Sequence, residues 1–291
     1  MSFKQIFITN KAYLSYQNNS MSVKTEFSDT LISLDDIDVI VVENQQTTIT
    51  SVLLSKLALA DITFIVTDHT YMPSALSIGL YKNSRTVKVQ RAQIVLSKPK
   101  LNRLWQETIK QKIYHQAITL NYFDDDEYLY SLVNKVQSGD KTYTESIAAA
   151  YYFKNMFGKG FNRSDELDTR NAALNYGYSI LRSSIARYII AYGLNPTFGI
   201  WHSSELNPYN LADDFLEPCR PIVDRFVKGE ITKESVMTPQ LKQSLVSLLF
   251  TKVVSSDGSS VLLKDALKAM VASYQSVCLK KREALELFSL E

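Results

Sequence analysis

Cysteine, histidine and glycine are scarce in this 291-residue sequence, which has 2 cysteines, 3 histidines and 9 glycines. Cys219 and Cys278 are isolated from each other, which excludes a disulfide framework and a paired-cysteine zinc motif. No apolar run approaches the ~18 residues of a membrane-spanning helix, and the N-terminus, MSFKQIFITN, lacks a signal-peptide pattern. A glycine loop of the P-loop type is also missing. We therefore expect a cytoplasmic protein that has no membrane partner.

Hydrophobic residues at 45% and charged residues at 21% are typical of an ordinary globular protein, and 291 residues are enough for two domains. The first ~95 residues have the short β-branched runs of buried strands, whereas the remainder has the periodicity of helices. Pro99 interrupts the pattern between them. We expect an α+β protein with a β-rich domain at residues 1–97 and a larger all-α domain at residues 98–291.

Within the first domain the pattern predicts strands at residues 5–8, 12–16, 38–43 and 62–67, with one amphipathic helix over 51–60. Residues 86–90, TVKVQ, alternate between apolar and polar and are interpreted as a further strand. Beyond residue 98, helices are predicted over 101–121, 128–136, 164–192, 238–254 and 262–288, with another helix carrying Glu145.

Positive charge is concentrated in one part of the chain although the net charge is only +2. Between Leu76 and Lys112 the only acidic residue is Glu107. The basic residues of this window are Lys82, Arg85, Lys88, Arg91, Lys98, Lys100, Arg103, Lys110 and Lys112. Such an excess indicates a phosphate-binding surface. A solvated face that keeps the protein dispersed is the alternative.

The stretch from Phe198 to Arg225 contains a grouping of residues typical of chemistry. His202 precedes a polar turn, and a helix start then carries Asp213, Asp214 and Glu217 on one side. Stacked carboxylates repel unless a cation neutralises them, so carboxylates beside an imidazole suggest a metal site. A structural histidine and ordinary acidic first-turn residues remain the alternatives. Pro218 and Pro221 lack backbone N–H groups, which predicts a bend in this helix.

Two other segments carry polar residues with more than one interpretation. Thr142 to Glu145 has the spacing of a capping box, in which the glutamate folds back onto the helix start. Asn171, Asn175 and Tyr176 fall on one side of the following helix. They either support a site or pack, and packing is favoured for the tyrosine.

Three phrases of the chain, in order, resemble the CRISPR-associated adaptation integrase family, the first of the two universal spacer-acquisition proteins. They are TESIAAAYYF from Thr144, NAALNYGY from Asn171 and HSSELNPYNLADDFLEPCRP from His202. The resemblance covers essentially the whole chain and is closest to the short form of type II systems. Many family members have aspartate where this chain has Glu217, and type II relatives resemble this chain in having glutamate.

The resemblance implies an endonuclease and integrase in which Glu145, His202 and Glu217 bind Mg²⁺ or Mn²⁺ and form the catalytic centre. It implies supporting or substrate-contacting roles for Asp214, Arg220, Asn171 and Asn175. DNA binding is expected at Lys82, Arg85, Lys88 and Arg91. The reaction implied is attack of a 3′-hydroxyl on a phosphodiester of the CRISPR repeat, which inserts a new spacer.

The partners implied are double-stranded DNA (spacer precursor and CRISPR repeat), a second copy of the chain, the small ferredoxin-like second adaptation protein and other type II CRISPR proteins. The β-rich domain would mediate dimerisation and partner contact. Two alternatives stay open. One is a metal-dependent nuclease or transposon-type integrase without a CRISPR partner, and the other is a DNA-binding scaffold that has lost its chemistry.

Overall fold

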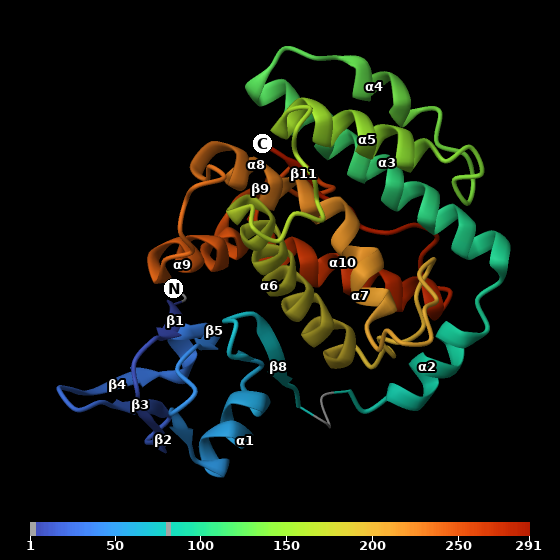
Figure 1. Cartoon of the computed structure of the whole chain (residues 1–291). Helices are drawn as coiled ribbons and strands as arrows, with labels where there is room; N and C mark the ends of the chain where they lie inside the picture. Colours follow the sequence, from blue (N-terminus) through green and yellow to red (C-terminus); the bar gives the residue numbers. More distant parts are fainter. Residues whose placement is uncertain (1–3, 80–82) are drawn as a thin grey trace. The chain divides into compact units, whose positions relative to one another are not determined.

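The structure of the chain is a computed structural model that describes residues 4–79 and 83–291. It consists of two compact units, residues 1–84 and 85–291 (Figure 1). The first is rich in strands and the second is mainly helical, which confirms the predicted α+β class. The division lies before α2 (Thr86–Ile94), whereas the sequence pattern had indicated residue 97.

The first unit contains two four-stranded sheets. One has the order β1-β5-β7-β8, in which the first three strands run parallel and β8 is antiparallel. The other has the order β4-β3-β2-β6. Their bounds are β1 Lys4–Ile8, β2 Tyr13–Gln17, β3 Ser20–Lys24, β4 Asp29–Ser33, β5 Ile37–Val42, β6 Thr48–Ile49, β7 Thr63–Thr67 and β8 Pro73–Ser77. The four strands predicted from the sequence are confirmed within a residue or two.

One core joins both sheets to helix α1 (Ser51–Leu59). Leu14 from β2, Ile40 from β5 and Leu53 from α1 have no exposed surface and belong to the same cluster. The Thr50 hydroxyl caps α1 by accepting a hydrogen bond from the Leu53 N–H at 3.4 Å. A short 3₁₀ turn, η1 (Leu34–Asp36), leads into β5. Alternating burial on the sheets and a leucine face on α1 therefore build this unit as the sequence predicts.

The strand predicted over residues 86–90 is wrong, because this segment forms helix α2 (Thr86–Ile94). A run of five residues fits a period of two and a period of 3.6 almost equally well. Burial of Val89 and Gln93, four residues apart, decides for the helix. The Gln93 side chain donates to the carbonyl oxygens of Asn195 and Phe198 at 2.9 Å each, so contacts distant in sequence fix the segment.

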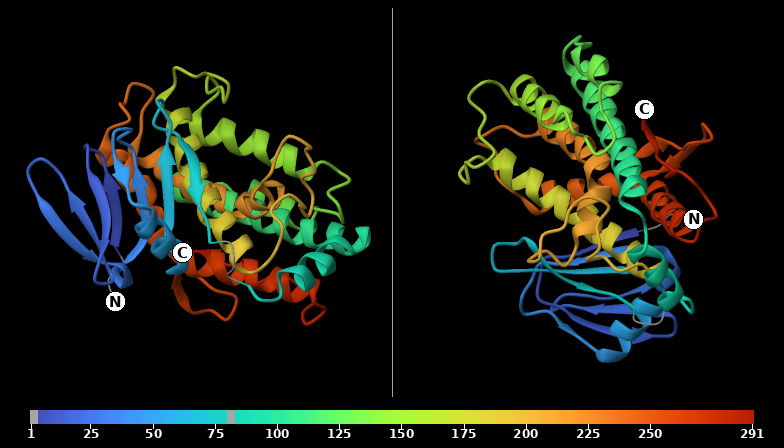
Figure 2. Two further views of the ribbon diagram at one scale, coloured as in Figure 1. Left: turned by 90° about the horizontal axis from the view of Figure 1, so that it is seen from below. Right: turned by 90° about the vertical axis from the view of Figure 1, so that its right-hand side faces the viewer.

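Long helices dominate the second unit. They are α3 Lys98–Phe123, α4 Tyr128–Val133, α5 Thr144–Phe157, α6 Thr169–Ala191, α7 Asn210–Leu216, α8 Arg220–Glu230, α9 Pro239–Ser247 and α10 Leu263–Cys278, with 3₁₀ turns η2 Glu217–Cys219 and η3 Leu248–Phe250. Helix α6 lies at the centre and packs against α7, α8, α9 and α10, while α3 runs along α4, α5 and α8 (Figure 2). Gly177 of α6 permits the close approach of α8, since a Cβ there would lie 2.5 Å from Val223 Cγ1.

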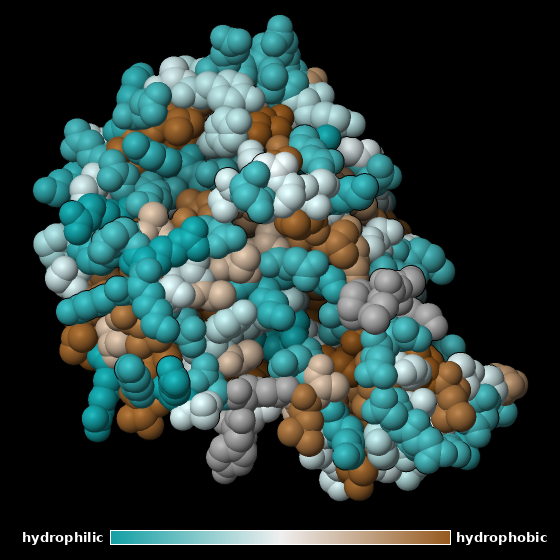
Figure 3. Space-filling view, turned by 180° about the vertical axis from the view of Figure 1, so that it is seen from behind, coloured by the Kyte–Doolittle hydropathy of each residue, from teal (hydrophilic) through white to brown (hydrophobic). Residues whose placement is uncertain are grey.

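A small sheet departs from the all-helical prediction for this unit. It has the order β10-β9-β11, with bounds β9 Lys252–Val254, β10 Ser260–Leu262 and β11 Ser289–Leu290. The two predicted C-terminal helices therefore end earlier than expected, at Ser247 and Cys278. In the described part of the chain, the helices that are long enough to cross a membrane are not apolar enough to do so. Figure 3 shows hydrophilic side chains interspersed with small, separate apolar patches on one face of the molecule.

Candidate active site

The bend predicted from Pro218 and Pro221 is present and carries Glu217. Helix α7 passes into the 3₁₀ turn η2, which begins at Glu217, and α8 then continues from Arg220. His115 of α3 holds the bend, because its Nδ1 lies 2.6 Å from the Pro218 carbonyl oxygen. Burial lowers the pKa of His115 to about 4, so the imidazole is neutral at pH 7 and Nδ1 carries the proton that it donates. The Glu217 side chain is thereby fixed in the interior, 6% exposed.

Lys112 of α3 joins the two predicted carboxylate ligands. Its Nζ lies 2.6 Å from Glu145 Oε1 and 2.6 Å from Glu217 Oε2, and its side chain is only 9% exposed. Burial alone would lower the pKa of Lys112, but the Glu217 and Glu145 carboxylates outweigh burial and raise it. Burial and the neighbouring charges also act in opposite directions on the pKa of Glu217, and the charges again outweigh burial. Burial acts to raise its pKa, and Lys112 and Arg220 lower it to about 2, so both partners are charged.

The capping-box interpretation of Glu145 is wrong. Asp140 caps helix α5 instead, because its carboxylate accepts hydrogen bonds from the Thr144 N–H at 2.9 Å and the Glu145 N–H at 3.1 Å. Tyr143 adopts the left-handed conformation with φ 53° and turns the chain into the helix. The Glu145 side chain is consequently free to extend toward Lys112, where it is 27% exposed.

Asp214 positions His202 from the buried side of α7. It has no exposed surface and accepts hydrogen bonds from the backbone N–H groups of Trp201 and His202, both at 3.1 Å. Its Oδ1 also lies 2.7 Å from His202 Nδ1. A carboxylate can only accept, so Nδ1 carries the proton and Nε2 of the neutral ring keeps a lone pair for a ligand. The hydrogen bond to Asp214 is the main cause that raises the pKa of His202.

The loop that carries His202 requires a glycine. A Cβ at Gly199 would lie 2.3 Å from the His202 carbonyl oxygen and 2.6 Å from Asp214 Oδ2. Aromatic rings support the loop from the other side. The Trp201 ring stacks on the buried Trp105 ring with centroids 5.5 Å apart, and the His202 imidazole lies nearly perpendicular to the Trp105 ring with centroids 5.7 Å apart. A cavity of about 410 Å³ opens beside His202 and Trp201.

The structure brings Glu145 and Glu217 to one ammonium group, and the charge of Glu217 contributes to the raised pKa of His202. Within residues 4–79 and 83–291, no three His, Cys, Asp or Glu side chains form a ready-made metal-binding group. The donor chemistry nevertheless fits a hard cation. Glu217 Oε2 is buried and receives no well-directed hydrogen bond, since its contact with Lys112 is an ion pair of poor hydrogen-bond geometry.

Of the other expected supporting residues, Arg220 contacts Glu217, whereas Asn171 and Asn175 contact Arg163. Arg220 Nε lies 3.0 Å from Glu217 Oε1, and its guanidinium lies 4.7 Å from the Tyr178 ring centroid. Arg163 donates to Asn171 Oδ1 at 2.6 Å and to Asn175 Oδ1 at 2.8 Å. Asn171 and Asn175 thus fix Arg163 and the loop that carries it. Tyr176 is fully buried, as favoured from the sequence.

Of the expected DNA-binding residues, Lys82 lies outside the described residues. Arg85, Lys88 and Arg91 are exposed at successive spacings of three on or beside α2, which places them on one side of the helix. A groove of about 580 Å³ lies nearby, and its basic lining residues are Lys88, Lys100, Arg103, Lys280 and Arg282. Lys112, also counted in the basic window, is buried in the carboxylate cluster and contributes no surface charge.

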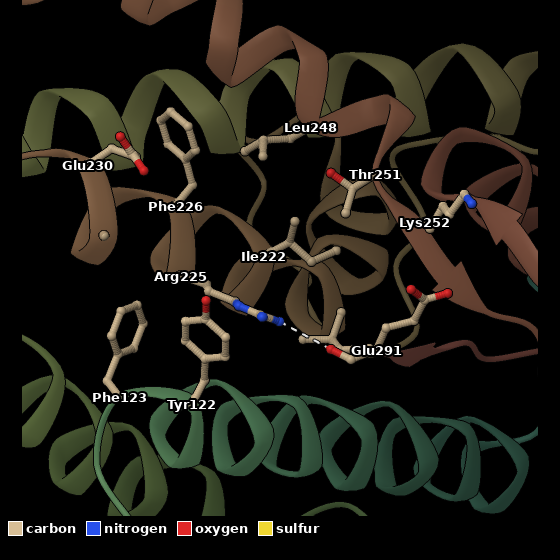
Figure 4. A pocket seen from close by; sticks show the side chains of 12 residues that line it. Tyr122, Phe123, Ile222, Arg225, Phe226, Glu230, Leu248, Thr251, Lys252 and Glu291 are labelled. Carbon is tan, nitrogen blue, oxygen red and sulfur yellow. Dashed lines mark hydrogen bonds between the residues drawn. The ribbon is translucent and has the colours of Figure 1, made fainter.

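A second cavity of about 580 Å³ has no predicted site residue among its lining (Figure 4). The Arg225 guanidinium lies 3.8 Å from the Tyr122 ring centroid, and its Nη1 donates to the Glu291 carbonyl oxygen at 3.1 Å. Arg225 therefore ties α8 to α3 and to the last described residue. This cavity is separate from the carboxylate cluster.

Sequence reasoning missed Lys112, His115 and Asp140 as parts of the site. Lys112 and His115 lie three residues apart on α3 and reach Glu217 and Pro218 together. A lysine among apolar residues within a long helix was the available signal, because a buried charge requires a partner. Asp140 stands directly after Gly139, whose φ is 70°, and that turn chemistry indicates a helix start.

Comparison with known proteins places this geometry in a family. The family model described as CRISPR associated protein Cas1 matches residues 6–255. The CRISPR-associated endonuclease Cas1 of Neisseria meningitidis serogroup C (strain 8013) is 36% identical over 284 residues, which cover 95% of this chain and 92% of the relative. A casposase bound to its integration product superposes with a TM-score of 0.80 at 17% identity, covering 97% of this chain and 92% of that one. A chain of a Cas6-RT-Cas1–Cas2 complex gives 0.73 at 16% identity, covering 97% of this chain and 35% of that one. The match over most of the chain, together with the close relative, establishes that this protein belongs to the Cas1 family of CRISPR-associated endonucleases.

Proposed function

We propose that the chain is a divalent-metal-dependent DNA integrase that inserts new spacers into a CRISPR array. The observation that carries the proposal is that Glu145 and Glu217 meet at the ammonium group of the buried Lys112, with His202 held nearby. Glu145, Glu217 and His202 Nε2 would hold a Mg²⁺ or Mn²⁺ ion. When bound, the ion would supply charge stabilisation to the scissile phosphodiester and to the attacking and leaving oxygens.

The residues around the ligands prepare the site before DNA arrives. Asp214 fixes the imidazole tautomer, and the bend at Pro218 keeps Glu217 in place. Arg220 Nε donates a hydrogen bond to Glu217 Oε1, so the carboxylate cannot rotate freely. A substrate phosphate would therefore meet oriented ligands, which lowers the cost of organising the reaction.

The reaction that this site would carry out exchanges one phosphodiester for another. The 3′-hydroxyl of the incoming DNA attacks a phosphorus of the repeat strand and loses its proton. The bond to the 3′-oxygen of the repeat breaks, and that oxygen leaves and is protonated. No ATP is consumed, because the number of phosphodiester bonds is unchanged. Water in place of the 3′-hydroxyl would nick the DNA instead.

The partners we propose are a second copy of this chain, double-stranded DNA and the small ferredoxin-like second adaptation protein, joined in type II systems by other CRISPR proteins. The strand-rich unit would provide the dimer and partner contacts, and the helical unit the chemistry. A chain of a Cas6-RT-Cas1–Cas2 complex shares this fold, which supports the assembly with a second adaptation protein. The exposed Arg85, Lys88 and Arg91 would contact DNA phosphates.

The test is a strand-transfer assay with a supercoiled plasmid that bears the repeat, with and without Mn²⁺ or Mg²⁺. We expect joining only with metal. His202→Ala should reduce joining by at least ~100-fold because a ligand is lost, since removing only the outer hydrogen-bond partner of a ligand already costs ~10–100-fold. His69→Ala is the matched control, since His69 is exposed in the strand-rich unit. Wild-type joining by folded His202→Ala would refute the site.

A further inference from the structure

Lys112 occupies the position between the two carboxylates that a divalent ion would need. Its Nζ is 2.6 Å from one oxygen of each glutamate, so the two oxygens are separated by no more than twice that distance. We propose that Lys112 is a resident counterion, which holds Glu145 and Glu217 together without metal and must leave them when a divalent ion binds. This inference rests on the proposed function.

The contacts of Glu217 leave no free carboxylate oxygen for a divalent ion unless one of its two basic partners moves. Arg220 contacts Oε1 and Lys112 contacts Oε2, so both oxygens of Glu217 already face a cation. Arg220 is three residues away on the same bend and packs on the Tyr178 ring, which fixes its guanidinium. Lys112 has a flexible four-carbon chain and only poor hydrogen-bond geometry to Glu217. Lys112 is therefore the cation that yields.

Charge balance leads to the same conclusion. Glu145 and Glu217 carry two negative charges, and Lys112 and Arg220 carry two positive ones, so the cluster is neutral. A divalent ion added to this neutral cluster would be repelled by the ammonium at short range, where the surroundings screen weakly. Moving Lys112 away removes that repulsion and frees an oxygen of each glutamate. The partly exposed side of the cluster at Glu145 gives the ammonium a route toward solvent.

The first test measures the dissociation constant of Mn²⁺ by electron paramagnetic resonance, without DNA. Lys112→Met keeps the length of the side chain and removes its charge, and we expect it to bind Mn²⁺ at least 10-fold more tightly than the wild type. Lys112→Arg keeps the charge and should bind no more tightly than the wild type. Lys100→Met is the matched control, because Lys100 pairs with Glu283 at 2.5 Å and makes no contact with these carboxylates. Equal or weaker binding by Lys112→Met would overturn the inference.

A second test uses the wild-type chain and avoids any folding defect of the variant. Acetic anhydride acetylates free amines, and mass spectrometry reports the rate at each lysine. We expect Mn²⁺ to increase labelling of Lys112 several-fold and to leave Lys100 unchanged. An unchanged rate at Lys112 under saturating Mn²⁺ would mean that the ammonium stays in place, against the inference.

The two proposals fail in different ways. If the wild type binds Mn²⁺ and His202→Ala weakens that binding, while Lys112→Met does not strengthen it, only the role of Lys112 is lost. If neither the wild type nor Lys112→Met binds Mn²⁺, the metal site itself is refuted, and the inference falls with it.

Discussion

Asp214 combines a structural and a chemical task in one buried carboxylate. It accepts backbone hydrogen bonds from the loop that carries His202 and also fixes the imidazole. Hydrogen bonds to a charged acceptor are stronger than neutral ones. They explain how a loop without regular secondary structure is held in one conformation. His115 has the corresponding task at the bend, where it is buried and neutral.

The neutral state of His115 predicts a pH-dependent contribution to stability. Burial lowers its pKa to about 4, so below the ordinary value of 6.5 the unfolded chain binds a proton that the folded chain does not. The contribution is complete above pH 6.5 and is lost as the pH falls toward about 4. We expect the advantage of the wild type over His115→Gln in free energy of unfolding to shrink by ~1.4 kcal/mol per pH unit in that range.

Urea unfolding of both proteins at pH 7.5, 6.5 and 5.5 measures this difference. The comparison with the variant is essential, because Asp224 acts in the opposite direction. Burial raises the pKa of Asp224 to about 6, so the folded chain gains stability as the pH falls from there to 3.8. Asp224 is present in both proteins and cancels. A difference that is constant with pH would contradict the assignment of His115 as a buried neutral group.

At the scale of elements, the site depends on how closely three helices approach. Helix α3 brings Lys112 to the bend between α7 and α8, and α5 brings Glu145 to the same point. Helix α6 supports α8 from the other side, and Gly177 sets their separation. A shift of α8 would move Glu217, because Glu217 lies immediately before that helix.

Gly177→Ala tests this packing. In an isolated helix, alanine is favoured over glycine by ~1 kcal/mol. Here the added Cβ would lie 2.5 Å from Val223 Cγ1, and overpacking of a core costs ~1–3 kcal/mol. We expect a net loss of stability, measured by urea unfolding, and a loss of DNA joining as α8 moves.

The matched control is the double variant Gly177→Ala with Val223→Ala, which removes the clashing methyl groups. It should be less destabilised than the sum of the two single changes, because the cavity and the clash relieve each other. Additive losses would show that the clash does not determine the separation of α6 and α8.

At the scale of the whole molecule, charge is distributed unevenly although the net charge is +2. Exposed basic residues of α2 and the basic groove contrast with the neutral carboxylate cluster in the interior. In the proposed function, the surface charges would attract DNA of any sequence, and the interior ones would determine whether an ion can bind. Binding and chemistry are therefore separable by substitution.

Replacing Lys88 and Arg91 together with glutamine should weaken binding of unrelated DNA sequences to a similar extent. The slope of log affinity against log salt should fall in magnitude by up to ~2, because each phosphate contact contributes ~0.9. Filter binding or fluorescence anisotropy over a range of salt concentrations measures it. Glutamine at Lys228 and Lys268, which are also exposed, is the control and should leave the slope unchanged. An unaltered slope for the α2 variant would identify that surface as solvated only.

The sequence by itself determined the fold class, most helices and strands, the bend at Pro218 and the family. These depend on local periodicity, on proline chemistry and on phrases that can be read along the chain. The sequence could not decide between strand and helix in short segments that fit both periods, as the helix at residues 86–94 shows. The competition between Thr142 and Asp140 to cap α5 was likewise decided by the turn at Tyr143.

Only the tertiary structure decided which charges meet. Lys112 appears in the sequence as one of nine basic residues in a window that predicts phosphate binding. The packing of α3 against α5 and the bend makes it the partner of both glutamates. Ion pairs between residues distant in sequence leave no periodic trace, because each charge alone is compatible with an exposed surface. Their energy depends on burial and on separations of a few ångströms, which the folded chain sets.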